Sequence, residues 1–230
     1  RGLGDVYKRQ VLTVRDNIHD GYLFMATKHG LVKKTPLSEF KNLRKSGLIA
    51  INLREGDELL KVKVTRGDAD IIIVSQEGNA IKFNEQDVRP MGRTASGVKS
   101  MNLRENDIAV CMDIAVDEED LLVISENGFG KRTPLTEYKR QNRGGVGLIT
   151  YKISEKTGKV VGATVCKPED ELMLINTSGI AIRINVSDIS VTSRSAMGVR
   201  LMRTSEEEKV VAIAKIAKTG DEEKDEQLSL

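Results

Sequence analysis

Short aliphatic runs alternate with polar turns along the whole chain. The runs hold four to seven residues rich in Val and Ile, such as 71–74, and Gly, Asn, Asp and Ser bound them. Residues 48–53 alternate apolar and polar side chains, as a half-buried strand does. Turns such as 55–57 (EGD) and 127–128 (NG) supply residues that tolerate the positive φ of a tight hairpin. The pattern predicts strands and hairpins, and no stretch of 11 residues has a helical period.

The same pattern of runs and turns occurs four times. Each copy opens with an aliphatic run, continues through a turn that ends in glycine, and reaches a second glycine 17 or 19 residues later. The first glycines are 48, 50 and 51 residues apart, a fixed period typical of repeat architectures. The copies span residues 22–65, 70–115, 120–166 and 171–216, with first glycines Gly30, Gly78, Gly128 and Gly179 and second glycines Gly47, Gly97, Gly147 and Gly198.

Units of about 50 residues with about four strands each predict a propeller-like array of antiparallel blades. In each unit we expect an opening hairpin, a long connection and a second hairpin. Such a unit buries its faces only against neighbouring units. Residues 11–16 (VLTVRD) parallel the end of a copy, so we expect the last strand of a missing blade there and an incomplete ring. One domain would therefore span residues 11–216.

The two ends of the chain differ from the repeats. Residues 1–10 share no pattern with the rest and are interpreted as a non-native, adapter-derived segment. Residues 217–230 are interpreted as a solvated acidic tail. The formal net charge of the 230 residues is +2, and the body between the two ends is mildly basic. Net charge alone therefore does not argue for nucleic acid.

Composition excludes several classes of protein. The chain has no Trp, and its longest aliphatic runs are too short to cross a bilayer. Cys111 and Cys166 both lie in aliphatic segments, which predicts reduced core residues rather than a disulfide scaffold. Neither histidine has a Cys, Asp or Glu partner at ligand spacing, and the acidic turns do not repeat a calcium-binding loop. We expect no metal site.

Charged residues recur at fixed positions in each unit. Acids gather in the turn of the second hairpin and between units, and bases gather after the first glycine and around the second. The array is therefore expected to carry an acidic rim and a basic rim, and a repeated cationic stripe fits a duplex bound along its backbone. The bases expected to bind DNA are Lys33, Lys34, Lys82, Lys131, Arg132 and Arg183 in the first group, and Arg44, Lys45, Arg93, Lys99, Lys139, Arg140, Arg143, Arg194 and Arg200 in the second.

The stretch 139–148 (KRQNRGGVGL) is the most basic of the long connections. Every copy places an arginine three or four residues before its second glycine. Glycines allow a backbone to approach a phosphate closely and to present its N–H groups. Neither a P-loop nor a dinucleotide-binding pattern is present, so the stretch is interpreted as one instance of a repeated cationic turn.

These motifs resemble the C-terminal domain of the DNA gyrase A protein. The resemblance rests on the repeat, on TPLSEF (35–40) and TPLTEY (133–138), on RPMGRTASGV (89–98) and on KRQNRGGVG (139–147), and it covers residues 11–216. It implies a β-pinwheel of six blades with strands exchanged between blades, of which this chain holds the last four. The box-like residues are Gln141, Asn142, Arg143, Gly144, Gly145, Val146 and Gly147, where Val146 replaces the second lysine of the family's QRRGGKG box.

The resemblance also implies a function. It predicts a non-catalytic domain that wraps double-stranded DNA around its basic rim, so that an ATP-dependent type II topoisomerase introduces negative supercoils. No cofactor is expected in this fragment, while the parent complex would use ATP and Mg²⁺ elsewhere. The parent chain would assemble with the gyrase B protein in an A2B2 heterotetramer, in the bacterial cytoplasm at the nucleoid and away from any membrane.

Two alternatives remain open. The related A protein of topoisomerase IV has a shorter and more degenerate set of blades. A propeller used as a protein-interaction scaffold is the other alternative, although such arrays carry Trp-containing or paired-Gly signatures and this chain has no Trp. Salt separates DNA binding from the scaffold, because affinity for phosphates falls as salt rises and affinity for an apolar partner does not.

Overall fold

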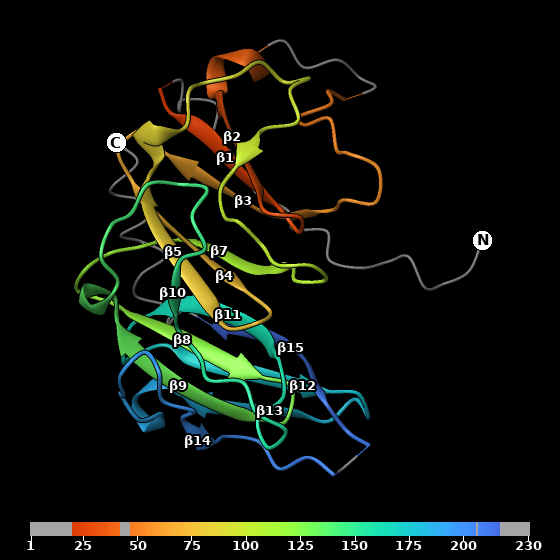
Figure 1. The fold of residues 1–230 in the computed structure, drawn as a ribbon, viewed down its shortest axis with the longest axis vertical. Coiled ribbons are helices and arrows are strands. Elements are labelled where there is room, and N and C mark those ends of the chain that lie inside the picture. Colours follow the sequence, from red (N-terminus) through yellow and green to blue (C-terminus); the bar gives the residue numbers. More distant parts are fainter. Residues whose placement is uncertain (1–19, 42–46, 206, 217–230) are drawn as a thin grey trace.

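The computed structural model describes residues 20–41, 47–205 and 207–216. The predicted all-β fold is confirmed, with four antiparallel sheets that follow one another from the red β1 to the blue β15 (Figure 1). The first sheet holds β1 (Tyr22–Thr27), β2 (Leu31–Pro36), β3 (Leu59–Thr65) and β6 (Val98–Lys99), and the second holds β4 (Asp70–Ser75), β5 (Asn79–Asn84), β7 (Ala109–Ile114) and β10 (Leu148–Ile149). The third holds β8 (Asp120–Ser125), β9 (Phe129–Pro134), β11 (Val160–Cys166) and β14 (Val199–Arg200), and the fourth holds β12 (Glu171–Asn176), β13 (Ala181–Asn185) and β15 (Val210–Ile216).

A short 3-10 turn follows the second strand of each unit. In the second, third and fourth units this turn starts the connection that leads back to the edge of the preceding sheet. They are η2 (Leu37–Phe40), η3 (Glu85–Asp87), η4 (Leu135–Glu137) and η5 (Val186–Asp188).

The central strands are apolar throughout because both faces of each middle sheet are buried. On β4, Ile71 and Ile73 pack into the cluster shared with the first sheet, whereas Ile72 and Val74 pack into the cluster shared with the third. A strand that alternates between two cores has no polar face, which explains the continuous run in the sequence. The closing strands β3, β7, β11 and β15 lie next to one another and join the sheets.

The fourth sheet is covered more on one face than on the other. On β12, Leu172 and Leu174 are fully buried against the third sheet, while Met173 and Ile175, which alternate with them, remain partly exposed. The alternation of burial along β12 is the pattern of a half-buried strand, in contrast to β4 and β8.

Each of the first three sheets is completed by the next unit. The two-residue strand β6 pairs with β2, β10 pairs with β5, and β14 pairs with β9, all antiparallel. The exchange that the family resemblance implies is therefore present. The predicted second hairpin within each unit is wrong, because this short strand bonds to the preceding sheet. Residues 48–53 form no strand, and the described residues contain no sheet before β1 that could accept them.

The second glycine of the second, third and fourth units stands where this exchange begins, whereas a Cβ at Gly47 of the first unit would have no atom within 4 Å. A Cβ atom at Gly97 would lie 2.5 Å from the carbonyl oxygen of Val32, and one at Gly198 would lie 2.2 Å from that of Gly130. Gly147 approaches Ala80 in the same way, at 2.4 Å. At these three positions glycine therefore permits a close approach between two protein backbones.

The two cysteines lie in the core, as predicted. Both are free and buried, and burial raises the pKa of each thiol to about 12. No helix among the described residues is long and apolar enough to span a membrane. The predictions for residues 1–10, 11–16 and 217–230, and those for Arg44 and Lys45, concern positions outside the described residues.

Candidate nucleic-acid interface

Three long connections pass along β2, β5 and β9, the strands that pair with the exchanged strands. We call residues 88–97, 138–147 and 189–198 the crossing loops. Each one begins beside β2, β5 or β9, through the bridges Lys34 to Pro90, Lys82 to Arg140 and Arg132 to Val191. Each is also fixed there by one 2.8 Å backbone hydrogen bond, donated by Met91, Gln141 or Thr192 to the carbonyl of the bridged cation.

Two lysines of the predicted rim lie under crossing loops. Lys33 and Lys131 occupy the same position, three residues after the first glycine, and both are 0% exposed. The ammonium of Lys33 donates to the carbonyls of Ala50 (2.7 Å) and Arg93. That of Lys131 donates to the carbonyls of Ser193 (2.6 Å) and Arg194. Burial, with a neighbouring arginine, lowers the pKa of each to about 8.

The cation one residue further along each strand is paired within the protein. Lys82 contacts Asp117 at 2.6 Å, and Arg132 contacts Asp120 at 3.2 Å while also donating to the carbonyl of Ile189. Lys34 and Arg183 occupy this position in the first and fourth units. Lys34 donates to the carbonyl of Glu85 and lies over the ring of Tyr22, and Arg183 pairs with Glu171.

The structure therefore differs from the exposed rim that the charge pattern predicts. Five of the cations after the first glycine are buried, and the sixth, Arg183, is exposed but paired. A cation on a strand of a buried sheet cannot stay unpaired, so its charge is compensated by carbonyls or carboxylates. The buried five are Lys33, Lys34, Lys82, Lys131 and Arg132.

The arginines of the crossing loops are presented toward solvent in a repeated way. Arg93, Arg143 and Arg194 are partly exposed and occupy the same loop position. Each donates from Nη1 to the carbonyl of a residue in the preceding unit, at 3.5 Å to Ile49, 2.9 Å to Lys99 and 3.4 Å to Ile149. A guanidinium has five N–H donors, so this contact leaves other Nη donors for a ligand, while Nε of Arg93 is buried and Nε of Arg143 is bonded within the protein.

Arg143 has one further anchor. Its Nε donates to the carbonyl of Asp87 at 3.0 Å, so two bonds hold its guanidinium. For Arg93 and Arg194, one guanidinium bond each is present among the described residues.

Other predicted cations lie around these arginines. Lys99, Lys139, Arg140 and Arg200 are exposed. Arg140 is held by Asp70 at 2.9 Å, and Arg200 lies over the ring of Phe129. Sequence reasoning missed Arg89, which is exposed and occupies the position of Lys139 in the preceding loop. Aligning the two loops on their second glycines would have found it.

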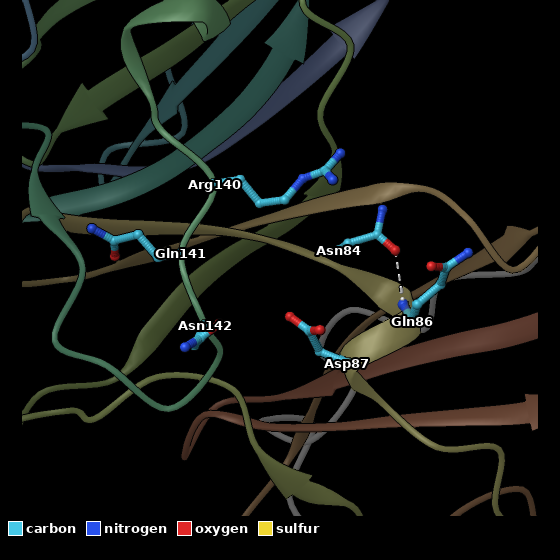
Figure 2. Close-up of a pocket in the computed structure, with 6 residues that line it drawn as sticks. All are labelled: Asn84, Gln86, Asp87, Arg140, Gln141 and Asn142. Atoms are coloured by element: carbon cyan, nitrogen blue, oxygen red, sulfur yellow. Dashed lines mark hydrogen bonds between the residues drawn. The ribbon is translucent and has the colours of Figure 1, made fainter.

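The box-like stretch 141–147 borders a shallow polar cavity of about 690 Å³. Arg140, Gln141 and Asn142 line it from the crossing loop, opposite Asn84, Gln86 and Asp87 (Figure 2). Within the stretch, the amide of Gly144 donates to the carbonyl of Ser100 at 2.6 Å, and the carbonyl of Gly145 accepts from Asn102. The amide of Gly144 and the carbonyl of Gly145 therefore bind protein backbone.

Several acids of the expected acidic rim are structural. Asp57 is buried and accepts from the amides of His29 and Glu58 at the tip of the first hairpin. Asp107 does the same in the second unit with Glu77 and Ile108. No group of three His, Cys, Asp or Glu side chains among the described residues is placed to hold a metal ion.

One buried carboxylate was not predicted. Glu85 is 0% exposed and accepts from the hydroxyl of Thr65 (2.7 Å) and from the amides of Gly67 and Ala69. The other units place Leu or Val at this position, so a single acid among aliphatic residues was the available signal.

A family model described as the DNA gyrase C-terminal domain, beta-propeller, matches residues 21–66, 69–110, 119–167 and 170–217. The DNA gyrase A protein of Clostridium acetobutylicum is 64% identical over 213 residues, which cover 93% of this chain and 26% of that protein. The gyrase A protein from a Staphylococcus aureus strain is 43% identical over 222 residues, covering 95% of this chain and 25% of that protein. The chain thus spans about a quarter of the length of these curated relatives.

Two solved structures resemble the fold closely. A DNA gyrase A C-terminal domain superposes with a TM-score of 0.78 at 30% identity, covering 88% of this chain and 68% of that one. A C-terminal domain of DNA topoisomerase IV superposes with a TM-score of 0.85 at 29% identity, covering 94% of this chain and 68% of that one.

Proposed function

Because the chain belongs to the DNA gyrase C-terminal domain family of the type II topoisomerases, we propose that it binds double-stranded DNA along its crossing loops and bends it. The observation that carries this proposal is the repeated placement of Arg93, Arg143 and Arg194. All three have the same guanidinium anchor and project from the same loop position. A row of fixed cations on one edge of successive sheets fits a backbone of evenly spaced phosphates.

The binding surface is smaller than the full set of predicted cations. Its members are the exposed or partly exposed residues of the crossing loops and exchanged strands. Of the buried cations, Lys33, Lys131 and Arg132 donate to carbonyls of the crossing loops and so support them from below. The buried cations would act on DNA only through their long-range electrostatic field. The surface comprises Arg89, Arg93, Lys99, Lys139, Arg140, Arg143, Arg194 and Arg200, with Arg183 at the edge of the fourth sheet.

Binding of this kind is electrostatic and weakly dependent on base sequence. The structure has short strands and 3-10 turns at this edge, so no helix among the described residues is available there to enter a major groove. Smooth bending of a short duplex costs on the order of 1–6 kcal/mol, which several phosphate contacts must offset. Each contact adds about 0.9 to the slope of log affinity against log salt.

For the whole protein we propose the activity of its relatives. The domain would direct DNA wrapping so that an ATP- and Mg²⁺-dependent gyrase introduces negative supercoils, with the gyrase B protein as its partner in an A2B2 assembly. We place this complex at the nucleoid in the bacterial cytoplasm. The domain itself would be non-catalytic.

The experiment is a salt titration of the 230-residue chain with a labelled duplex of about 40 base pairs, followed by fluorescence anisotropy. We expect a steep log–log slope, which a triple Arg93→Ala, Arg143→Ala, Arg194→Ala variant reduces by about 2–3. The matched control is Arg54→Ala, Arg104→Ala, Lys152→Ala, which removes the same charge from exposed positions that follow residues 48–49, 98–99 and 148–149. These three pairs of residues, with 199–200, are the exchange segments. A folded protein whose binding is absent or independent of salt would contradict the proposal.

A second candidate is the corresponding domain of topoisomerase IV. The higher TM-score to the topoisomerase IV domain favours it, whereas the relatives of highest identity named above are gyrase A proteins. Ligating a nicked plasmid in the presence of the chain separates the two. A large change in linking number indicates gyrase-type wrapping, and its absence despite tight binding favours the topoisomerase IV type.

A further inference from the structure

Lys33 and Lys131 are placed to act on the crossing loops from beneath. Both are fully buried, and each ammonium bridges carbonyl oxygens that include the one of the loop arginine itself, Arg93 or Arg194. An ammonium in this position cannot reach a phosphate on the outside of the loop. Its three donors instead neutralise carbonyls that a turn would otherwise leave without partners.

The repeat contains its own comparison for this position. The second unit has Ile81 where the first and third have Lys33 and Lys131, and Ile81 is also 0% exposed. The sheet therefore accepts an apolar side chain here, and the lysine is not needed to form the strand. Since burying an ammonium is costly, a role beyond the strand must offset that cost.

The loops over lysine and the loop over isoleucine hold their arginines differently. Over Ile81, Arg143 has two guanidinium bonds, to the carbonyls of Asp87 and Lys99. Over the lysines, Arg93 and Arg194 show one such bond each among the described residues, and the buried ammonium fixes the arginine carbonyl. In the loops over lysine, a bond to the carbonyl of the arginine thus replaces the second bond that the guanidinium of Arg143 makes.

Arg194 shows the complete arrangement. Its amide donates to the carboxylate of Glu137 (3.2 Å), its carbonyl accepts from Lys131, and its Nη1 donates to the carbonyl of Ile149. Removing the ammonium would free the carbonyl between the other two anchors. The direction of the guanidinium would then be set by one long hydrogen bond of 3.4 Å.

We infer that Lys33 and Lys131 are positioning residues, which orient Arg93 and Arg194 toward DNA phosphates without touching the DNA. The inference rests on the proposed function, because it assigns these arginines to phosphate contacts. It changes the role of both lysines from direct ligands to supports. It also predicts that the second unit, with its isoleucine, works without such a support.

The test is a double-mutant cycle on the 230-residue chain with Lys131→Met, Arg194→Ala and the double variant. Ile81→Met is the matched control, since it places the same side chain at the same position under the second loop. Affinity for the 40-base-pair duplex is measured by anisotropy. Mobility of the loop is measured without DNA, as hydrogen exchange of the amides in 189–198.

We expect Lys131→Met to weaken binding about three- to tenfold, to reduce the salt slope by about one contact, and to speed exchange in 189–198. In the Arg194→Ala background the same change is expected to have no further effect on affinity, because the group that it positions is absent. The affinity of Ile81→Met for the duplex should stay within about twofold of wild type, because this change removes no phosphate contact.

Three results would overturn the inference: unchanged affinity in Lys131→Met, effects of the two single changes that multiply in the double variant, or unchanged exchange in the loop. Failure of the proposed function looks different, because then the wild-type chain does not bind DNA while Lys131→Met still speeds exchange. If Lys131→Met does not fold, Lys33→Met with exchange measured at 88–97 provides the same comparison in the first unit.

Discussion

The crossing loop over the second sheet and those over the first and third reach the same geometry by different chemistry. Over the second sheet, Ile81 packs beneath Gly145, with 3.7 Å between its Cδ1 and the site of a Cβ. Over the third sheet, Lys131 fills that volume and binds two carbonyls. The difference shows that a repeat can conserve the position of an arginine while the support beneath it alternates between apolar packing and a buried charge.

The exposed residue beside each loop arginine also alternates between apolar and basic along the repeats. At the second residue of the exchange segment, the units carry Ile49, Lys99, Ile149 and Arg200, and Ile49 and Ile149 are 69% and 59% exposed. A lysine beneath the loop thus accompanies an isoleucine beside it, and an isoleucine beneath the loop accompanies a lysine beside it. Each site keeps about the same number of cations and distributes them between interior and surface.

The largest effects are expected where the two kinds of site are alike. Gly147→Ala and Gly198→Ala each place a Cβ within 2.4 Å of a carbonyl oxygen of the preceding sheet, at a positive φ. Both should lower the free energy of unfolding by on the order of 2–3 kcal/mol, measured by urea denaturation. Gly145→Ala, with no contact shorter than 3.7 Å, is the control and should cost less than about 1 kcal/mol, as an ordinary surface change does. A large difference between Gly147→Ala and Gly198→Ala would mean that the exchange strands are not equivalent.

Single arginine changes come next and compare the anchors. Arg143→Ala and Arg194→Ala should each weaken DNA binding about three- to tenfold, since each removes about one phosphate contact. Arg143→Lys should be worse tolerated than Arg194→Lys, because an ammonium cannot keep both carbonyl contacts of Arg143. Anisotropy at one fixed salt concentration decides this, and equal losses in the two lysine variants would contradict the difference in anchoring.

Exchanging the exposed residues at 99 and 149 should reverse which of the two positions contributes a phosphate contact. Ile149→Lys is expected to tighten binding about two- to fivefold and to raise the salt slope by about 0.9, and Lys99→Ile is expected to do the opposite. Both positions are exposed, so the free energy of unfolding should change little. The salt series is the measurement, and parallel slopes for the two variants would show that this position does not face phosphate.

The smallest effect concerns pH and stability. The pKa of Lys131 is lowered to about 8 in the folded protein, from 10.5, so between these values the unfolded chain binds more protons. The contribution of Lys131 to the free energy of unfolding should therefore rise as the pH rises from about 8 to about 10.5. The thiols act in the opposite sense, because their folded pKa is raised to about 12.

The comparison of wild type with Lys131→Met isolates the lysine from the thiols. Urea denaturation should show that, from about pH 7.5 to about pH 9.5, the free energy of unfolding of wild type increases relative to that of the variant. The absence of any difference would mean that the ammonium keeps its proton through this range.

The sequence predicted the strands well because burial on two faces leaves an unmistakable run, as at 71–74 and 121–124. It did not predict by local pattern that Val98 and Lys99 leave their own unit, because a two-residue strand has no periodicity of its own. The burial of Lys33 and Lys131 was also missed, since residue type alone suggested a surface. The isoleucine at the equivalent position in the second and fourth units was the available sign of an interior site.

The exchange of β6, β10 and β14 means that the segment repeated in sequence is not the segment that closes a sheet. A chain cut after residue 166, at the end of the third repeat, would keep β8, β9 and β11 but lose β14. It would also lose Met202, whose carbonyl lies against Gly128. Any genetic shortening or lengthening of the array at repeat borders therefore damages the neighbour as well. The segment that can be removed or added with its sheet intact is therefore shifted relative to the sequence repeat. Its borders lie between an exchanged strand and the closing strand that follows it, as between β6 and β7.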